Sequence, residues 1–147
     1  MMQTTSLAAG DLYIQAEKYV GIPYAEHGRD TFGVDCYGLF RLFYLQEFDI
    51  LLPDFQYTEY TTATHARIIQ QNMLSVVHQI AESDAVPGDA VLLAYGGSIS
   101  HIALYLGHDA ILHASRSMNA KISRLTDMEG IRTLRSRIAG WYRCHCT

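Results

Sequence analysis

The sequence changes character at one turn, Val86-Pro87-Gly88-Asp89. Before this turn, apolar residues recur at spacings of three and four, the pattern of amphipathic helices, in residues 11–20, 36–48 and 63–82. After it, short runs typical of strands are separated by turn-forming residues: residues 90–95, 101–106, 110–114, 122–125 and 138–143. Thr126 and Glu129 have capping-box spacing and predict a short helix before the last strand. N-terminal helices followed by an antiparallel meander predict an α+β fold, with the helices packed on the sheet.

The size and composition of the chain predict one domain, residues 1–147. A chain of 147 residues is long enough to bury about two thirds of its unfolded surface in a single core. Hydrophobic residues make up 49% and charged residues 18%, a balance that excludes a disordered chain. The sequence contains no repeat, low-complexity segment or linker that would divide it.

Charge and hydropathy exclude two kinds of partner. The net charge of −4 gives no long-range attraction to nucleic acid. No stretch approaches the ~18 uninterrupted apolar residues of a membrane helix. The N-terminus lacks a basic segment followed by an apolar run, so we expect synthesis in the cytoplasm without a signal peptide. Three cysteines are an odd number and too few for a disulfide scaffold.

Cys36 lies where a loop enters the helix predicted for residues 36–48. A helix N-terminus carries unpaired backbone N–H groups and the positive end of the helix dipole, and both stabilise an anion. We therefore expect a lowered pKa for the Cys36 thiol and a nucleophilic thiolate. Considered alone, Cys36 also fits a buried cysteine without a chemical role.

Two histidines in the strand region provide the groups that a cysteine nucleophile needs. His101 begins one predicted strand, His113 lies in the next, and Gly107-His108-Asp109 forms the turn between them. Hairpin pairing about this turn places His101 and His113 opposite each other on neighbouring strands, which suits a base and the group that orients it. The other histidines of the helix, loop and turn regions are expected to be structural: His27, His65, His78 and His108.

These residues stand in a pattern that resembles the NlpC family of papain-like cysteine peptidases. Gly21-Ile22-Pro23-Tyr24 and Asp35-Cys36-x-Gly38-Leu39 resemble the segments around the family's cysteine. Three later blocks occur in the family's order: Pro87-Gly88-Asp89-Ala90-Val91-Leu92, Ser100-His101-Ile102-Ala103-Leu104-Tyr105-Leu106-Gly107 and Ile111-Leu112-His113-Ala114. The resemblance spans about residues 11–143, and Gly28-Arg29-Asp30-x-x-Gly33-Val34-Asp35-Cys36 is most similar to the branch found in phage tail-assembly proteins.

The resemblance implies a role for each matched residue in a papain-like fold. Cys36 would be the nucleophile, His101 the general base and acid, and His113 the orienter. Tyr24 would lie beside the oxyanion hole, and Asp35 would meet a free amine on the substrate. Family members typically cleave peptidoglycan stem peptides, and the reaction needs no cofactor.

Tyr37 is a departure from the pattern of the cell-wall members. A serine usually stands at this position, where it helps to hold the substrate amine. A tyrosine would narrow or reshape that subsite, which puts the usual bond preference in question. The alternative is that Tyr37 packs against the aromatic loop that follows the helix.

Three functions are consistent with the pattern. The first is a peptidase acting on stem peptides, as part of a phage tail beside other tail proteins or at the cell wall. The second is a structural tail subunit that keeps the fold, and the third is an amidase or acyltransferase with the same nucleophile. The terminal Cys144-His145-Cys146 offers at most three soft ligands, so we expect no metal and a frayed end.

Overall fold

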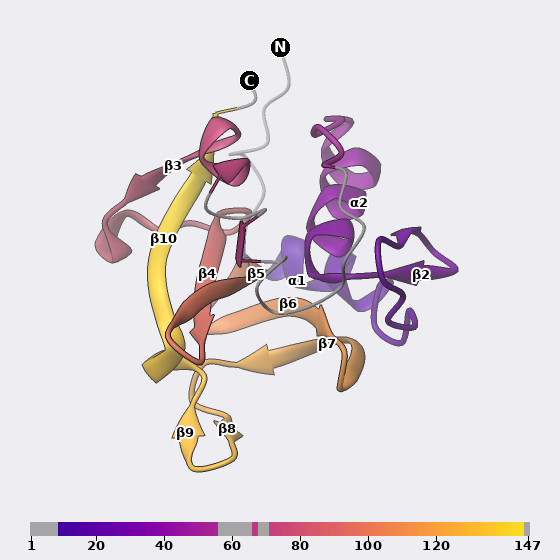
Figure 1. Ribbon diagram of the computed structural model, residues 1–147. Helices are drawn as coiled ribbons and strands as arrows, with labels where there is room; N and C mark the ends of the chain where they lie inside the picture. The colour runs from indigo at the N-terminus through magenta and orange to yellow at the C-terminus, as the bar shows by residue number, and fades with distance from the viewer. Residues whose placement is uncertain (1–8, 56–65, 68–70, 146–147) are drawn as a thin grey trace.

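The computed structural model describes residues 9–55, 66–67 and 71–145. The N-terminal part contains α1 (Ala9–Glu17), β1 (Arg29–Asp30), β2 (Gly33–Val34) and α2 (Cys36–Phe48). The remaining elements are η2 (Met73–Ser75), β3 (Val77–Ile80), η3 (Glu82–Asp84), β4 (Ala90–Tyr95), β5 (Ser98–Gly107), β6 (Ala110–Ser115), β7 (Met118–Arg124), β8 (Met128–Glu129), β9 (Arg132–Thr133), η4 (Arg135–Arg137) and β10 (Ile138–Cys144). The helices lie beside a curved sheet, so the fold is α+β as the sequence predicts (Figure 1).

The sheet has six antiparallel strands in the order β3-β10-β4-β5-β6-β7. Strands β4 to β7 form the predicted meander, and β10 returns to lie between β3 and β4. Two small hairpins project from the molecule in Figure 1, β1–β2 at the right beside α2 and β8–β9 at the bottom. No helix in the described ranges is long and apolar enough to cross a membrane.

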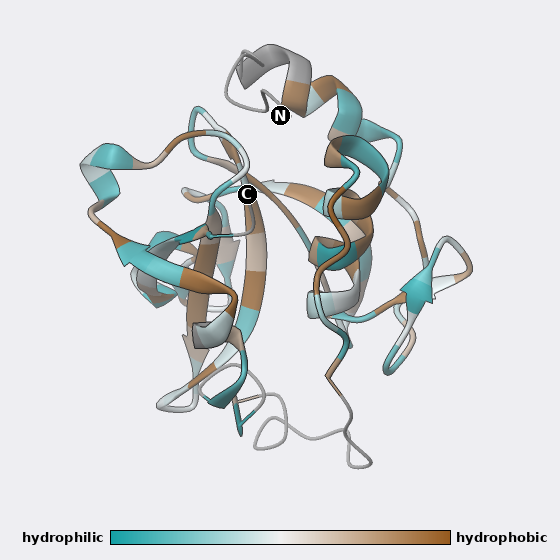
Figure 2. Ribbon diagram, turned by 90° about the horizontal axis from the view of Figure 1, so that it is seen from above, coloured by the Kyte–Doolittle hydropathy of each residue, from teal (hydrophilic) through white to brown (hydrophobic). Residues whose placement is uncertain are grey.

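Apolar side chains cover both faces of the sheet. Successive strand residues point to opposite faces, so Leu92 and Ile102 join the larger cluster with the helices while Val91 and Ala103 join a smaller one. Trp141 belongs to the smaller cluster. Figure 2 shows apolar segments of the helices and the strands facing each other between the two layers. This packing fixes α2 against β5 and β6, and it therefore determines where the first residue of α2 meets the sheet.

The helix predicted for residues 63–82 is wrong in its last part. Val77–Ile80 forms β3, which pairs with β10 from Cys144 to Trp141. β-branched residues such as Val77 and Ile80 pack well on a pleated surface, so pairing with β10 overrides the helical spacing. Ala66 and Arg67 are helical, and the rest of the predicted start lies outside the described residues.

Two other predicted elements differ from the structure. The helix expected at Thr126 is a turn followed by β8, because the Asp127 carboxylate accepts a hydrogen bond from the backbone N–H of Arg124. The β8–β9 pairing of Met128 with Thr133 then takes the place of helical hydrogen bonds. Near the N-terminus, α1 ends at Glu17, three residues before the predicted end of that helix.

Candidate active site

Asp35 begins α2 and delivers Cys36 to its first turn. The Asp35 backbone is extended, and its Oδ1 accepts a hydrogen bond of 2.7 Å from the backbone N–H of Gly38. This is an N-cap, which satisfies a backbone N–H that the helix itself leaves unpaired. A Cβ at Gly38 would overlap the carbonyl oxygen of Gly28, so only glycine lets the preceding loop approach the helix. The local sequence therefore fixes the position of Cys36 by a cap and a close approach.

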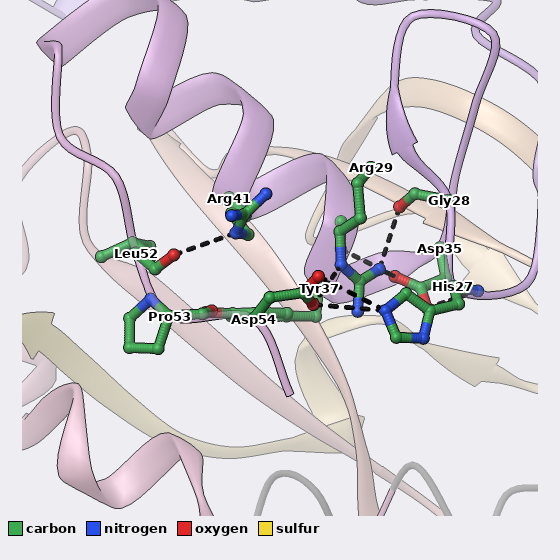
Figure 3. A network of polar contacts seen from close by, with 10 residues as sticks. His27, Gly28, Arg29, Asp35, Tyr37, Arg41, Leu52, Pro53 and Asp54 are labelled. Atoms are coloured by element: carbon green, nitrogen blue, oxygen red, sulfur yellow. Dashed lines mark hydrogen bonds and ion pairs between the residues drawn. The ribbon is translucent and has the colours of Figure 1, made fainter. Parts of the chain in front are cut away.

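Asp35 is held from several sides and is 1% exposed. Its Oδ1 lies 2.8 Å from Nη1 of Arg29, and its Oδ2 accepts a hydrogen bond of 3.1 Å from the backbone N–H of His27. Arg29 also binds Asp54, with 2.8 Å between Nε and Oδ1. His27 is 3.3 Å from the same oxygen (Figure 3). The loop before α2 and the segment after it are therefore joined through charged side chains.

Tyr37 and Arg41 of α2 bind the backbone of the segment that follows the helix. The Tyr37 hydroxyl donates to the carbonyl of Pro53, and Nε of Arg41 donates to the carbonyl of Leu52 at 2.9 Å (Figure 3). The Tyr37 ring lies 5.1 Å from that of Phe55, centroid to centroid. Tyr37 thus packs against the segment that follows α2, which is the alternative to a role in the amine subsite.

A pocket of about 510 Å³ opens beside the N-terminus of α2. Cys36 and His101 both line it, together with Tyr24, Tyr95 and Arg137. Cys36 is the free cysteine of the described part of the chain. The structure thus brings the predicted nucleophile and the predicted base to one cavity.

His101 and His113 meet behind the pocket wall. Nε2 of His101 lies 2.9 Å from Nδ1 of His113, and the two rings are 5.1 Å apart. The strands pair Leu104 with Leu112, two positions away from the register that would set the histidines opposite each other. A shift by two residues keeps both side chains on one face of the sheet, so the rings meet diagonally.

The pKa of the Cys36 thiol moves in the opposite direction from the one that the sequence predicts. Burial raises it to about 12, and the charge of Asp35 adds to the rise. Backbone N–H groups of Ile102 and Tyr37 and the charge of Arg29 act in the other direction but do not outweigh burial. The prediction of a lowered pKa is therefore wrong, because the helix terminus that would stabilise a thiolate is itself buried and capped by a carboxylate.

Tyr24 presents a buried hydroxyl to the pocket. Within the described ranges this hydroxyl has no hydrogen bond of normal geometry. Burial, together with the charges of Cys36 and Asp35, raises its pKa to about 12, while the nearby Arg116 opposes the rise. A protonated phenol next to the thiol can donate to an oxygen that becomes negative during a reaction.

A comparison with known families is in agreement with this arrangement. A family model described as the NlpC/P60 family matches residues 21–135, most of the chain. The chain belongs to the NlpC/P60 family.

Curated NlpC/P60 relatives have several activities in their names. The chain is 33% identical over 127 residues to the gamma-DL-glutamyl hydrolase of Bacillus subtilis, a match that covers 80% of this chain and 27% of the relative. It is 30% identical over 112 residues to a probable endopeptidase p60 of Listeria grayi, covering 76% and 19% respectively. It is 32% identical over 113 residues to the tail tip assembly protein K of Escherichia phage lambda, covering 75% and 56%. The chain thus spans only part of each of these relatives.

Solved structures of NlpC/P60 domains share the fold. The domain of the peptidoglycan hydrolase SagA has a TM-score of 0.61 at 21% identity, and the match covers 93% of this chain and 98% of that one. A family member from Bacillus cereus has a TM-score of 0.64 at 23% identity, covering 96% of this chain and 41% of the other. The papain-like NlpC fold that the sequence predicts is therefore confirmed.

Three predicted site residues are not among the described residues that line the pocket of this NlpC/P60 domain: His113, which contacts His101, and Asp35 and Tyr37. A substrate amine at Asp35 would have to compete with Arg29 for the carboxylate. Contact of Asp35 or Tyr37 with a substrate stays a prediction.

Polar groups that the sequence analysis missed form one wall of the pocket. The Tyr95 ring meets His101 edge-on at 5.9 Å, and its hydroxyl donates to Oε1 of Glu129 at 2.8 Å. The guanidinium of Arg137 lies 4.4 Å from the centroid of the Tyr95 ring, and its Nε is 3.1 Å from the same Glu129 oxygen. These residues come from β4, the β8–β9 hairpin and η4, and no local pattern in the sequence links them.

The C-terminal motif lies at the far end of β10. Cys144 is disulfide-bonded, so it does not offer a free thiol. Nδ1 of His145 is 3.3 Å from Nδ1 of His78, and Nε2 of His145 is 2.8 Å from the carbonyl oxygen of Ser75. The described residues contain no group of three or more side chains that could hold a metal ion.

Proposed function

We propose that this NlpC/P60 chain is a cysteine peptidase that hydrolyses amide bonds in peptidoglycan stem peptides. The observation that carries the proposal is the shared pocket of Cys36 and His101, with His113 bonded behind the base. The names of the curated relatives support the substrate class. They include a probable endopeptidase p60 of Listeria grayi and the murein DD-endopeptidase and murein LD-carboxypeptidase MepS of Escherichia coli, which is 26% identical over 113 residues.

In the proposed reaction, His101 removes the proton from the Cys36 thiol while the sulfur attacks the carbonyl carbon of the substrate. Because the pKa of the thiol is raised, the base has to accept this proton during the attack. The carbonyl oxygen becomes an oxyanion, which the Cys36 backbone N–H and the Tyr24 hydroxyl would stabilise. His101 then gives its proton to the leaving amine, and the carbon–nitrogen bond breaks to leave a thioester on Cys36. His101 next deprotonates a water molecule, whose oxygen attacks the thioester carbon. The carbon–sulfur bond then breaks, the acid leaves, and His101 returns the proton to the sulfur of Cys36.

The pocket favours a substrate that carries a carboxylate near the scissile bond. Arg137 and Arg116 both line the pocket, where Arg137 pairs with Glu129 of the lining and Arg116 pairs with Glu26 outside it. Nε of Arg137 is buried and, among the described groups, has no hydrogen bond of good alignment. A carboxylate next to these guanidinium groups would gain charge-assisted hydrogen bonds. The relative named gamma-DL-glutamyl hydrolase supports a glutamate-containing acyl group.

We assign Asp35 and Tyr37 to positioning of the nucleophile. The Asp35 oxygens hold the first turn of α2 and the loop before it. Tyr37 fastens the Pro53 segment along the helix. Both interactions support the position of Cys36, whether or not either side chain also contacts a substrate.

A place in a phage tail is the proposed setting of this activity. It is supported by the 32% identity to tail tip assembly protein K, of which the chain covers 56%. Where a phage genome encodes the chain, mass spectrometry of the purified tails of that phage should detect it as a virion component. Its absence from those tails would favour release at the cell wall without assembly.

Digestion of purified peptidoglycan tests the proposed reaction. Wild-type protein should release defined fragments from sacculi of at least one peptidoglycan type, identified by mass spectrometry. Cys36→Ser should release none, while the exposed control Ser75→Ala should match wild type. Failure of the wild type on all peptidoglycan types, with the protein folded, would favour the structural subunit. Transfer of the acyl group to an added amine in place of water would favour the acyltransferase.

A further inference from the structure

A line of buried polar groups continues inward from the pocket to a serine on β7. Nε2 of His101 is 2.9 Å from Nδ1 of His113, and Nε2 of His113 is 2.9 Å from Oγ of Ser123. These residues are 5%, 1% and 4% exposed, so solvent does not replace these contacts. Ser123 pairs with Ile111 across β6 and β7 while His113 pairs with Lys121, which sets Ser123 diagonally beside His113. Three neighbouring strands therefore supply one member each.

The protons of this line have only two consistent arrangements when both imidazoles are neutral. A neutral imidazole has one N–H donor and one acceptor nitrogen. In the first arrangement His113 donates its Nε2–H to Ser123, and its Nδ1 accepts the Nε2–H of His101. In the second, Ser123 donates to Nε2 of His113, and the Nδ1–H of His113 points at Nε2 of His101.

Only the first arrangement makes His101 a base toward Cys36. With its proton on Nε2, His101 keeps a lone pair on Nδ1, the nitrogen that must take the thiol proton because Nε2 binds His113. In the second arrangement Nδ1 of His101 already carries the proton, so it cannot accept one from the thiol. When His101 accepts a second proton, the first arrangement needs no change, whereas the second would place two N–H groups against each other.

His113 cannot avoid this choice by becoming charged. Burial lowers its pKa well below the ordinary value of 6.5, and the neighbouring His101 and Lys121 lower it further. Lys121 lies across the β6–β7 pair and is exposed. His113 is therefore neutral near neutral pH, and its hydrogen-bond partners decide which ring nitrogen carries its one proton.

We propose that Ser123 is a positioning residue that accepts the Nε2–H of His113 and so keeps the lone pair of His101 directed at Cys36. The role in catalysis rests on the proposed function, but the place of the proton does not. Ser123→Ala would leave the Nε2–H of His113 buried without an acceptor. Since a buried donor without a partner is costly, the ring would shift toward the Nδ1–H form.

Nitrogen-15 NMR of protein with labelled histidines tests the proton positions without any substrate. Wild type should show an acceptor-type Nδ1 and a protonated Nε2 for His113, assigned by comparison with His113→Asn. Ser123→Ala should move the His113 Nδ1 signal toward the protonated type, and Ser123→Thr should restore it. A wild-type spectrum with His113 protonated at Nδ1 would overturn the proposal, whether or not the protein cleaves any substrate.

Kinetics with a stem peptide that wild type cleaves gives the second measurement. Ser123→Ala should lower kcat roughly tenfold with KM unchanged, because it weakens the base without touching the binding wall. Ser123→Thr should recover most of the rate, and the exposed control Ser75→Ala should equal wild type. An unchanged kcat for a folded Ser123→Ala would overturn the catalytic part of the proposal. If Ser123→Ala does not fold, the wild-type spectrum still decides the place of the proton, and Ser123→Cys, whose sulfur is a weaker acceptor, replaces Ser123→Ala in the kinetics.

Discussion

Nε2 of His101 and Nδ1 of His113 lie 2.9 Å apart, although the pairing of their strands sets the two residues diagonally. This contact uses the nitrogen of His101 that faces away from the proposed reaction. The other nitrogen of His113 contacts Ser123, and in the proposed reaction the other nitrogen of His101 acts on Cys36. The contacts between β5, β6 and β7 therefore hold the His101 ring in one orientation.

Removal of either histidine should lower activity, but to different degrees. His101→Ala should lower kcat/KM by about 10² to 10⁴, because both proton transfers lose their group. His113→Ala should cost less, since it removes only the orientation of His101, and His113→Asn should recover part of the loss through its amide oxygen. Fragment release from one stem peptide measures these effects, with melting temperature as the folding control. Equal rates for His113→Ala and wild type would show that the contact has no catalytic use.

The Cys36 thiol should react slowly with iodoacetamide near neutral pH. Its pKa is raised to about 12, so the thiol form dominates and the alkylation rate should rise only in alkaline solution. The same cysteine in urea should titrate at the ordinary value of ~8.5. Mass spectrometry of the Cys36 peptide after timed alkylation gives both profiles. A folded-state profile centred below the unfolded one would restore the lowered pKa that the helix position predicts.

Gly38→Ala should destabilise the protein strongly. The added methyl group meets the backbone carbonyl of Gly28, which cannot move without disturbing the loop that holds Asp35. We expect a loss of about 3 kcal/mol in the free energy of unfolding, the range typical of core overpacking. Gly96→Ala is the matched control, because a Cβ there meets no other atom. Its only cost in stability is the strain of a left-handed φ of 59°. Urea denaturation of both variants makes the comparison, and similar losses would argue against the close approach.

Asp54→Asn should reduce stability at neutral pH by about 1 kcal/mol or less, since the Asp54 side chain is 31% exposed. Burial acts to raise the pKa of Asp54, but Arg29 and His27 outweigh it, so the pKa is lowered from 3.8. A lowered pKa means that the unfolded state binds the proton first. The stability from ionised Asp54 is therefore present above pH 3.8 and lost as the pH falls through the lower folded-state value.

Urea denaturation at several pH values measures the effect of Asp54. The difference between wild type and Asp54→Asn should shrink below pH ~3.8. Glu17→Gln, at an exposed position of α1, is the control and should show no such trend. A difference that grows on acidification would contradict the ion pair.

Arg137→Met should raise KM about tenfold for a stem peptide with a free carboxylate beside the scissile bond, the effect of losing a charge-assisted hydrogen bond. The corresponding carboxamide peptide should be affected much less, since it cannot form the ion pair. Arg132→Met, an exposed residue outside the pocket lining, is the control. Equal effects on both peptides would show that Arg137 acts through packing on Tyr95 and not through recognition of charge.

Local signals made parts of the site predictable. Asp35 before an apolar stripe marks a helix start, and the structure uses it as the N-cap of α2. The turn at Gly107-His108-Asp109 was enough to set His101 and His113 on one face, even with the register displaced by two residues. Residues two apart on a strand share a face, so this pairing still brings the His101 and His113 rings into contact.

Long-range contacts account for what the sequence did not predict. β3 forms because β10 pairs with it. The sequence around Val77 does not predict this pairing, because its partner Cys144 is more than sixty residues away. Glu129 and Arg137 reach Tyr95 only after the sheet has folded. The raised pKa of Cys36 depends on burial in three dimensions, which the helix position alone does not reveal.

The most direct measurement of the central claim is the mass of the enzyme during turnover. The protein is mixed with a stem peptide that it cleaves, quenched in acid within the first turnover, and digested for mass spectrometry. The account predicts a thioester of the acyl fragment on the peptide that contains Cys36, absent in Cys36→Ser. Cleavage of the same peptide by Cys36→Ser at the wild-type rate, with no adduct on the wild-type cysteine, would contradict it.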